Sequence, residues 1–293
     1  MRKVLRYSNF KLMLVTSAAR NLPTHPVDQY LMVEDARLRF RDEGAGPAVI
    51  LLHGWTLDLE MWDPQVARLR QEFRLVRVDR RGHGFSSGTP STARDATDVA
   101  ALCHHLGLTR VAVIGMSQGA RTALAFAGGA PERVDAVILD GPPSFELAPA
   151  DEDVPFEHLR TVARTRGMAA FRREWLRHPL TQLRTANPQM HAQLIAMIER
   201  FAGNEFTDSP LEPEVLPVPA LPRSSNAPAL VLSGELDVPR RVQSADRLSV
   251  QLPRAERAVI TGAGHLPNLD RPDEYSEICR AFLNRHTRAR STP

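Results

Sequence analysis

The sequence predicts an α/β protein with a mainly parallel sheet that helices cover on both faces. Short apolar strands alternate with amphipathic helical segments along most of the chain, which is typical of parallel sheets. Some strands, such as residues 47–52, are apolar without interruption, as expected of strands buried on both faces. A strand also runs directly into a tight glycine-containing turn and an alanine-rich helix over residues 111–128.

The individual elements can be placed in order from residue 28. Residues 30–33 and 38–40 flank a short polar turn and predict an antiparallel hairpin. Further strands are expected at 47–52, 73–78, 111–114, 134–139, 229–233 and 258–261. Apolar residues at helical spacing predict helices near 61–69 and 99–106, and a final helix from about 273 to 284.

One segment interrupts this alternation. Between residues 143 and 226 no strand is evident, but two sets of apolar residues share helical faces: Met168, Phe171 and Trp175, then Met190, Leu194, Met197, Ile198 and Phe201. Asn187 and Pro188 suit the N-cap and first turn of the second helix. A proline-rich return follows over 210–228. We expect a helical lid over the carboxyl ends of the strands, where open α/β sheets bind ligands.

The composition is that of a globular protein with an unusual leader. The 293 residues are 43% hydrophobic and 24% charged. Residues 1–27 contain five basic side chains and no acidic one, which leaves 32 basic against 34 acidic side chains in the rest. The nearly neutral body argues against nucleic-acid binding. No apolar run approaches the roughly 20 residues that span a bilayer. Cys103 and Cys279 have no metal-ligand or redox spacing, and we expect free, buried thiols.

The leader has three interpretations. Its basic start, short apolar run and small residues resemble a signal peptide, but the apolar run is short. A flexible extension of a cytoplasmic protein is the expectation that we adopt, and an upstream start codon with the true start nearer Met32 is the third interpretation. We therefore expect an extension (1–27), a core (28–142 and 227–293) and a helical cap (143–226).

The turn at residues 115–119 has the pattern Gly-x-Ser-x-Gly. A side chain at Gly115 or Gly119 would collide where the strand and the helix approach each other, so glycine allows Ser117 to hold strained backbone angles. The helix that begins there directs its free N–H groups toward an oxyanion at the same place. The pattern predicts a nucleophile elbow with Ser117 as the nucleophile.

A serine hydroxyl needs a base beside it, and the base needs an orienting acid. We expect His265, after the last strand, as the base and Asp237, after the preceding strand, as the acid. Asp140, which ends the strand before the insert, is the alternative acid. The backbone N–H groups of Trp55 and Gln118 are the candidate oxyanion donors.

The other histidines fit the role of the catalytic base less well. His53 and His83 lie in turns, where we expect them to form hydrogen bonds with the backbone and to shape the loops. His104 and His105 are adjacent on a helix, so they do not form a metal pair, and we expect them in solvent.

Five motifs in order resemble the α/β-hydrolase superfamily, in its serine-nucleophile esterase, lactonase and perhydrolase-like branch with a helical cap. They are His53-Gly54-Trp55, Asp79-x-Arg81-Gly82-x-Gly84-x-Ser86, Gly115-x-Ser117-x-Gly119, Gly234-x-x-Asp237 and Gly264-His265. The resemblance covers roughly residues 28–285 and implies an eight-stranded sheet. The leader lies outside it, and the cap carries no motif.

The resemblance implies a cofactor-independent hydrolase of small carboxylic esters or lactones, with neither a metal, a nucleic acid nor a membrane as partner. Ser117 would form an acyl-enzyme that water hydrolyses with the help of His265 and Asp237. Serine at 117 argues against epoxide hydrolysis and dehalogenation, which use a carboxylate there on this fold. The alternatives are cleavage of carbon–carbon bonds in β-diketone-type substrates, acyl transfer or perhydrolysis, and a non-catalytic ligand receptor.

Overall fold

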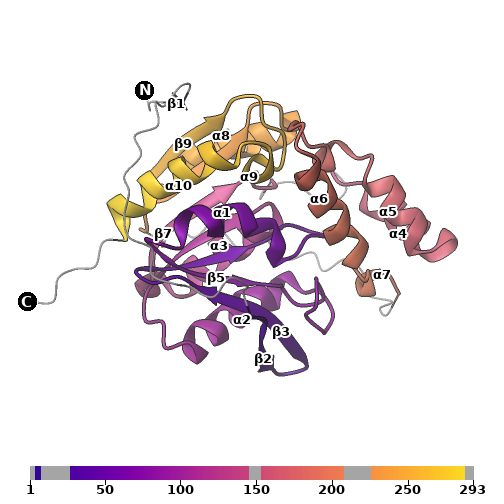
Figure 1. The fold of residues 1–293 in the computed structure, drawn as a ribbon, viewed down its shortest axis with the longest axis horizontal. Coiled ribbons are helices and arrows are strands. Elements are labelled where there is room, and N and C mark those ends of the chain that lie inside the picture. The colour runs from indigo at the N-terminus through magenta and orange to yellow at the C-terminus, as the bar shows by residue number, and fades with distance from the viewer. Residues whose placement is uncertain (1–3, 8–26, 145–152, 208–225, 288–293) are drawn as a thin grey trace, which may run out of the picture.

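A single mainly parallel sheet organises the molecule. The computed structural model describes residues 4–7, 27–144, 153–207 and 226–287, and these contain a nine-stranded sheet in the order β1-β9-β8-β7-β6-β4-β5-β3-β2 (Figure 1). The strands are β1 (Val4–Tyr7), β2 (Gln29–Val33), β3 (Ala36–Glu43), β4 (Ala48–Leu52), β5 (Arg74–Val78), β6 (Val111–Met116), β7 (Val134–Asp140), β8 (Ala229–Gly234) and β9 (Ala255–Ile260). Only the β2–β3 and β3–β5 pairs are antiparallel in this described sheet.

The expected strands are confirmed, with small changes at their ends. β2 and β3 form the predicted hairpin, and β9 begins three residues earlier than its apolar pattern indicated. Strands β2 to β9 are the eight expected in the body. The leader supplies a ninth, because Val4–Tyr7 pairs in parallel with β9.

Helices cover both faces of the sheet, as the uninterrupted apolar strands predicted. Alternate residues of a strand face opposite sides, so Val49 and Leu51 of β4 belong to one core, and Ile50 and Leu52 to the other. Helices α1 (Asp63–Leu69) and α10 (Pro272–His286) pack into the first core. Helices α2 (Thr92–His105), α3 (Gln118–Gly129) and α8 (Pro239–Gln251) pack into the second. Short helices connect these elements: η1 (Leu59–Trp62), η2 (Pro131–Arg133) and α9 (Pro267–Asp270).

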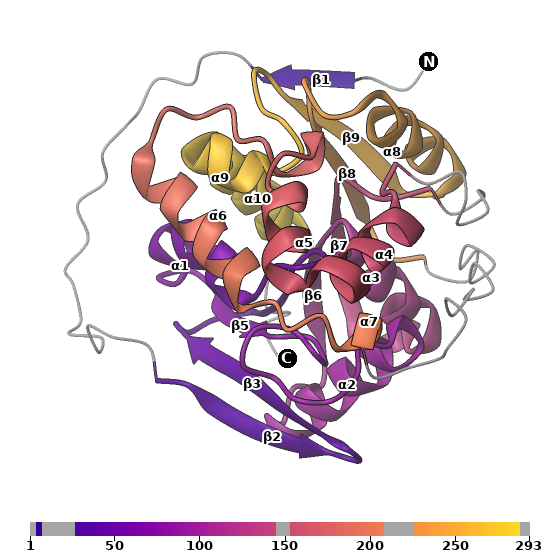
Figure 2. The same cartoon turned by 90° about the vertical axis from the view of Figure 1, so that its right-hand side faces the viewer.

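The described residues between β7 and β8 form four inserted α-helices. They are α4 (Phe156–Arg166), α5 (Met168–Trp175), α6 (Pro188–Arg200) and α7 (Asn204–Thr207), and the 3₁₀ helix η4 (Pro179–Thr181) joins α5 to α6. The two expected helices are α5 and α6, and Asn187 caps α6 by accepting a hydrogen bond from the Gln189 N–H. The proline-rich return over 210–225 lies outside the described residues. Figure 2 looks onto these helices where they cover one end of the sheet.

The inserted helices share a core with the loop after β4. Trp55 and Leu57 of that loop lie in one apolar cluster with Phe171, Trp175 and other side chains of the insert. Trp55 is ringed by Phe156, Phe171, Trp175, Phe201 and Phe206, with ring centroids 4.7–6.1 Å away. This burial holds the insert above the strand ends.

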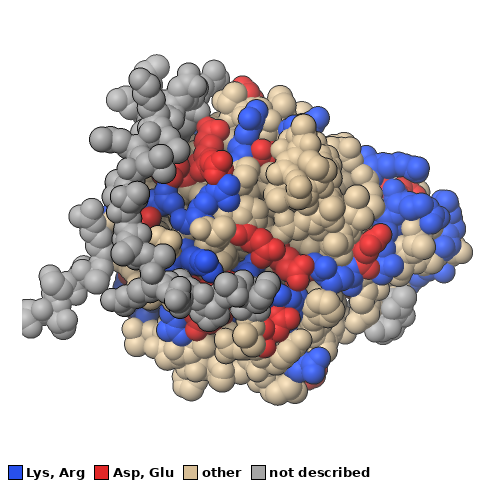
Figure 3. All heavy atoms as spheres, in the orientation of Figure 1, with Lys and Arg blue, Asp and Glu red and all other residues tan. Residues whose placement is uncertain are grey.

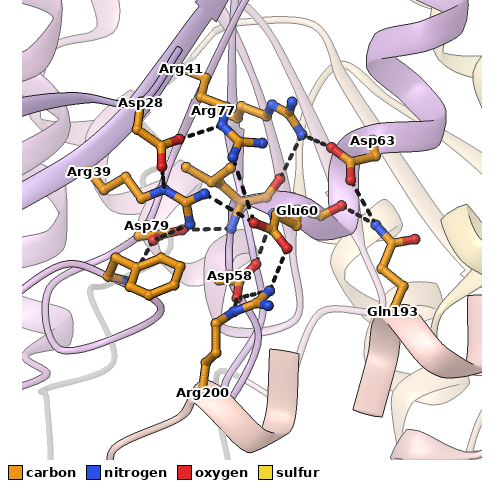
Figure 4. A network of polar contacts seen from close by, with 12 residues as sticks. Asp28, Arg39, Arg41, Asp58, Glu60, Asp63, Arg77, Asp79, Gln193 and Arg200 are labelled. Atoms are coloured by element: carbon orange, nitrogen blue, oxygen red, sulfur yellow. Dashed lines mark hydrogen bonds and ion pairs between the residues drawn. The ribbon is translucent and has the colours of Figure 1, made fainter. Parts of the chain in front are cut away.

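A polar network also ties the insert to the core (Figure 4). Arg200, at the end of α6, pairs with Asp58 and with Glu60 at 2.6 Å in both cases. Glu60 also pairs with Arg39 of β3 at 3.0 Å, and Arg39 contacts the buried carboxylate of Asp79 at 3.2 Å. The network therefore runs from the insert into the sheet.

The surface charge is unevenly distributed. Figure 3 shows blue side chains gathered over α4 and α5, where Arg164, Arg166, Arg173 and Arg177 are exposed, whereas both signs mix elsewhere on this face. Among the described residues, no helix combines the length and the apolar character that crossing a bilayer requires.

Candidate active site

Ser117 lies on the sharp turn between β6 and α3, with φ 51° and ψ −115°. This backbone conformation is strained for a residue with a side chain. A Cβ on Gly115 would lie 2.2 Å from the Gly119 carbonyl oxygen, and one on Gly119 would lie 2.3 Å from that of Leu52. Both glycines are therefore required by close approach of backbone, as the sequence predicted. The Ser117 N–H donates to the Asp140 carbonyl at 2.8 Å, which fixes the turn to β7.

The structure brings His265 and Asp237 together. His265 Nδ1 lies 2.9 Å from Asp237 Oδ2, and both residues are buried. The other oxygen, Oδ1, accepts the Val238 N–H at 2.7 Å, so the carboxylate is held from both sides. A Cβ on Gly141 would lie 2.9 Å from His265 Cε1, so the imidazole packs directly against backbone. The ring is therefore fixed with Nδ1 toward the acid.

Asp140, the alternative acid, lies in a different environment. Its side chain is fully buried beside the Tyr275 hydroxyl, and none of the described imidazole groups contacts it. Burial, and secondarily the negative charge of Asp237, raises the pKa of Asp140 well above its usual value. A carboxyl group whose charged form is disfavoured by burial, and which contacts no imidazole, is poorly suited to be the orienting anion. The geometry favours Asp237.

Ser117 and His265 line one pocket beneath the inserted helices. The pocket encloses about 530 Å³ of empty space, part of it open to solvent, and Trp55, Phe156, Trp175 and Leu266 supply apolar walls. Within the described residues no hydrogen bond joins Ser117 Oγ to His265. Instead, Ser117 Oγ accepts a long hydrogen bond of 3.4 Å from Arg241 Nη1.

The two candidate oxyanion donors, the backbone N–H groups of Trp55 and Gln118, come from the loop after β4 and from the start of α3. Both residues line the pocket beside Ser117. Neither N–H donates a hydrogen bond to another described residue. The two groups are therefore available to an oxygen atom that enters the pocket.

The Trp55 indole has a half-buried partner that the sequence did not indicate. Its Nε1–H donates to Glu205 Oε1 of α7 at 2.7 Å, and the second carboxyl oxygen of Glu205 has no partner within the described residues. Burial raises the pKa of Glu205 to about 7, although the hydrogen bond from Trp55 opposes the shift. The carboxyl group thus titrates near neutral pH beside the candidate oxyanion loop.

His53 and His83 have the loop-shaping roles expected from the sequence. His53 Nδ1 donates to the Gly54 carbonyl at 2.7 Å, and its Nε2 accepts the Arg80 N–H at 2.8 Å. His83 Nδ1 contacts the Arg81 carbonyl at 3.0 Å. Burial, followed by the charge of Arg80, lowers the pKa of His53 well below its usual value and that of His83 to about 3. Both rings are therefore neutral. His104 and His105 are exposed, as expected.

Asp79 and the motif that follows it support the loop carrying Trp55. Asp79 accepts the N–H groups of Leu59 at 2.7 Å and Phe85 at 2.8 Å, which joins the loops after β4 and β5 (Figure 4). A Cβ on Gly84, which has φ 54°, would lie 2.2 Å from Asp79 Oδ2. The motif therefore positions the site without lining it.

Two further residues near Ser117 carried no recognisable motif. Arg241 is 3% exposed on the first turn of α8, and it pairs through Nε and Nη2 with Asp153 of the insert at 2.8 and 2.9 Å. Nothing in the local sequence separates Arg241 from its exposed neighbour Arg240, because only the direction of the helix decides which of them turns inward.

Both cysteines are free and buried, as expected.

Comparison with known proteins agrees with this architecture. Residues 47–272 match the model of the alpha/beta hydrolase fold family. A pimeloyl-acyl-carrier-protein methyl ester esterase of Pectobacterium carotovorum is 31% identical over 265 residues, covering 84% of this chain and 98% of that relative.

Two solved structures are similar in fold. A thermophilic esterase from Thermogutta terrifontis matches with a TM-score of 0.74 and 26% identity, over 89% of this chain and 99% of that one. The enol-lactonase from Burkholderia xenovorans matches with a TM-score of 0.72 and 26% identity, over 87% and 100% of the two chains. With its sheet order, its elbow and the family match over most of its length, the chain belongs to the α/β hydrolase fold family.

Proposed function

We propose that this protein hydrolyses carboxylic esters or lactones through a Ser117-His265-Asp237 triad and an acyl-enzyme intermediate. The observation that carries the proposal is the buried His265–Asp237 pair at the pocket that also contains the strained Ser117. The named activities of the esterase and lactonase relatives support ester-bond hydrolysis in general. We also propose that residues 143–226 act as a cap over this pocket.

In the first step, Ser117 Oγ attacks the ester carbonyl while His265 Nε2 accepts its proton. The Nδ1–H group donates a hydrogen bond to Asp237, which keeps Nε2 unprotonated before attack and stabilises the imidazolium afterwards. The hydroxyl must first turn from Arg241 toward His265. Catalytic hydrogen bonds are often long in free enzymes and shorten only when substrate is bound.

The negative charge that develops on the carbonyl oxygen needs fixed donors. The N–H groups of Gln118 and Trp55 meet this need, since both border the pocket without an acceptor among the described residues. The first of them also lies at the start of α3, where the helix dipole favours an anion.

His265 then protonates the leaving alcohol and activates the water that releases the acyl group. A lactone follows the same course, except that its leaving alcohol stays attached to the acyl chain. The apolar walls supplied by Trp55, Phe156 and Trp175 suit the carbon skeleton of a small substrate.

The test is Ser117→Ala, assayed with a short p-nitrophenyl ester. We expect kcat to fall by at least about 10³-fold, because the covalent step is lost while the oxyanion donors remain. The thermal unfolding midpoint should match that of the wild type, since alanine adopts the turn at no greater cost than serine. Retained turnover in a folded variant would remove the covalent mechanism.

A further inference from the structure

Arg241 is a buried cation that the proposed reaction does not use. It lies on the first turn of α8 and is 3% exposed, yet it lines the same pocket as Ser117. A guanidinium group is costly to bury unless anions or acceptors surround it. Its position beside the nucleophile therefore needs an explanation beyond packing.

Asp153 accounts for one edge of this guanidinium. The carboxylate binds Nε and Nη2 at 2.8 and 2.9 Å, which is a bidentate pair along the side edge of the arginine. Although burial opposes ionisation, the charge and hydrogen bonds of Arg241 lower the pKa of Asp153, so the pair is ionised. The pair holds the planar group in one orientation.

The other edge of the guanidinium points toward the nucleophile. Arg241 Nη1 lies 3.4 Å from Ser117 Oγ, a long hydrogen bond to a neutral hydroxyl. An arginine offers a second fork, Nη1 with Nη2, that matches a carboxylate as well as the side edge does. Arg121 of α3 lines the same pocket, and no Asp or Glu is among the described residues that line it. Its described lining therefore holds two guanidinium groups and no carboxylate, beside apolar walls.

We propose that Arg241 binds a carboxylate of the substrate, so that the preferred substrates are esters or lactones carrying a carboxylate close to the scissile carbonyl. This inference rests on the proposed ester hydrolysis and narrows its substrate class. Asp153 acts as a positioning residue that fixes the guanidinium and leaves its end edge for the substrate.

The distances limit how far that carboxylate lies from the reacting carbon. The carbonyl carbon sits about 3–3.5 Å from Ser117 Oγ during attack, and a carboxylate oxygen sits about 2.8 Å from the guanidinium nitrogen. Because Oγ and Nη1 are themselves 3.4 Å apart, the two substrate groups are close neighbours. Roughly one to three carbon atoms separate them, as in half-esters of short dicarboxylic acids.

The experiment compares kcat/KM for two matched pairs of esters, followed by pH-stat titration. On the acyl side, monomethyl succinate is compared with methyl 4-methylpentanoate, a neutral ester of the same shape. On the alcohol side, carboxymethyl butyrate is compared with isobutyl butyrate. We expect the wild type to prefer the anionic member of at least one pair by about 10- to 100-fold, the range for a hydrogen bond between charged groups.

The variant Arg241→Met should bring that ratio to about one, whereas Arg240→Met, which removes an exposed charge from the same helix turn, should leave the ratio unchanged. Arg241→Met leaves the carboxylate of Asp153 without its cationic partner and can destabilise the fold. If thermal unfolding shows such a loss, the double variant Arg241→Met with Asp153→Asn replaces the single variant.

The outcomes separate the two proposals. If the wild type hydrolyses both neutral esters through Ser117 but prefers no anionic one, the substrate inference fails, the Arg241–Asp153 pair only anchors the insert, and the proposed hydrolase stands. A preference that survives Arg241→Met also overturns the inference. If no ester of either kind is hydrolysed, the proposed function itself fails.

Discussion

His265 Nδ1 lies 2.9 Å from Asp237 Oδ2, although the two residues follow different strands. Asp237 comes just after β8 and His265 just after β9, and these strands are parallel neighbours. The carboxyl ends of neighbouring parallel strands meet at one edge of the sheet, so the loops deliver both side chains to one place. Ser117 follows β6 at the same edge, two strands away from β8. The sheet order itself assembles the site.

The acid of the site can be identified by comparing two isosteric changes. Asp237→Asn should lower kcat for a short ester by about 10³- to 10⁴-fold, because the amide favours the wrong histidine tautomer and cannot stabilise the imidazolium. Asp140→Asn is the matched control. Burial raises the pKa of Asp140 and disfavours its charged form, and its carboxyl group does not contact His265, so we expect a change of less than about tenfold. Steady-state kinetics at pH 7 would decide, and a larger loss in Asp140→Asn than in Asp237→Asn would reverse the assignment.

Glu205 should make stability depend on pH. The pKa of Glu205 is raised from 4.5 to about 7, so the folded protein keeps a proton that the unfolded chain has already lost in this range. The resulting stabilisation is present in full below the unfolded pKa and disappears as the pH rises through the folded pKa. Relative to Glu205→Gln, the wild type should lose about 3 kcal/mol of unfolding free energy between about pH 4 and about pH 8.

Denaturant titrations of both proteins across that range would measure the loss. Glu199→Gln, an exposed change on α6, serves as the control and should follow the wild type at every pH. Parallel pH profiles for the wild type and Glu205→Gln would contradict the raised pKa.

The ion pairs of Arg200 should fasten the insert to the core. Arg200→Met leaves the carboxylate of Asp58, which is fully buried, without its cationic partner (Figure 4). We expect the unfolding free energy to fall by about 1–3 kcal/mol. We also expect the substitution to accelerate amide exchange more in α6 than in the sheet. Denaturant titration would measure the loss of free energy, and hydrogen–deuterium exchange read by mass spectrometry would measure the faster exchange. Arg173→Met, an exposed change on α5, is the control, and equal exchange in the two variants would rule out the anchoring role.

Much of this architecture could be predicted because it depends on backbone constraints that leave local signals. An added Cβ at Gly115 or Gly119 would lie only 2.2–2.3 Å from a backbone oxygen, and such a requirement appears directly as residue type. The apolar runs of β4, β6 and β8 likewise reflect burial on both faces. Sheet order then places Ser117, Asp237 and His265 at one edge.

The remaining features depend on contacts between distant segments, which have no local pattern. Glu205 meets Trp55 across 150 positions, and Asp153 meets Arg241 across 88. A single charged residue is usually exposed, so the sequence offers no reason to expect either of these two pairs. The pairing of Val4–Tyr7 with β9 was missed for a similar reason, since the basic leader shows no strand-like alternation.

The most direct test of the account is to treat the protein with a fluorophosphonate and map the modified peptide by mass spectrometry. This reagent forms a stable adduct only with a serine that is activated as a nucleophile. We predict one adduct, on Ser117, formed in parallel with loss of esterase activity and slowed by at least about 10³-fold in His265→Ala. Full esterase activity in a protein without an adduct on Ser117 would contradict the account.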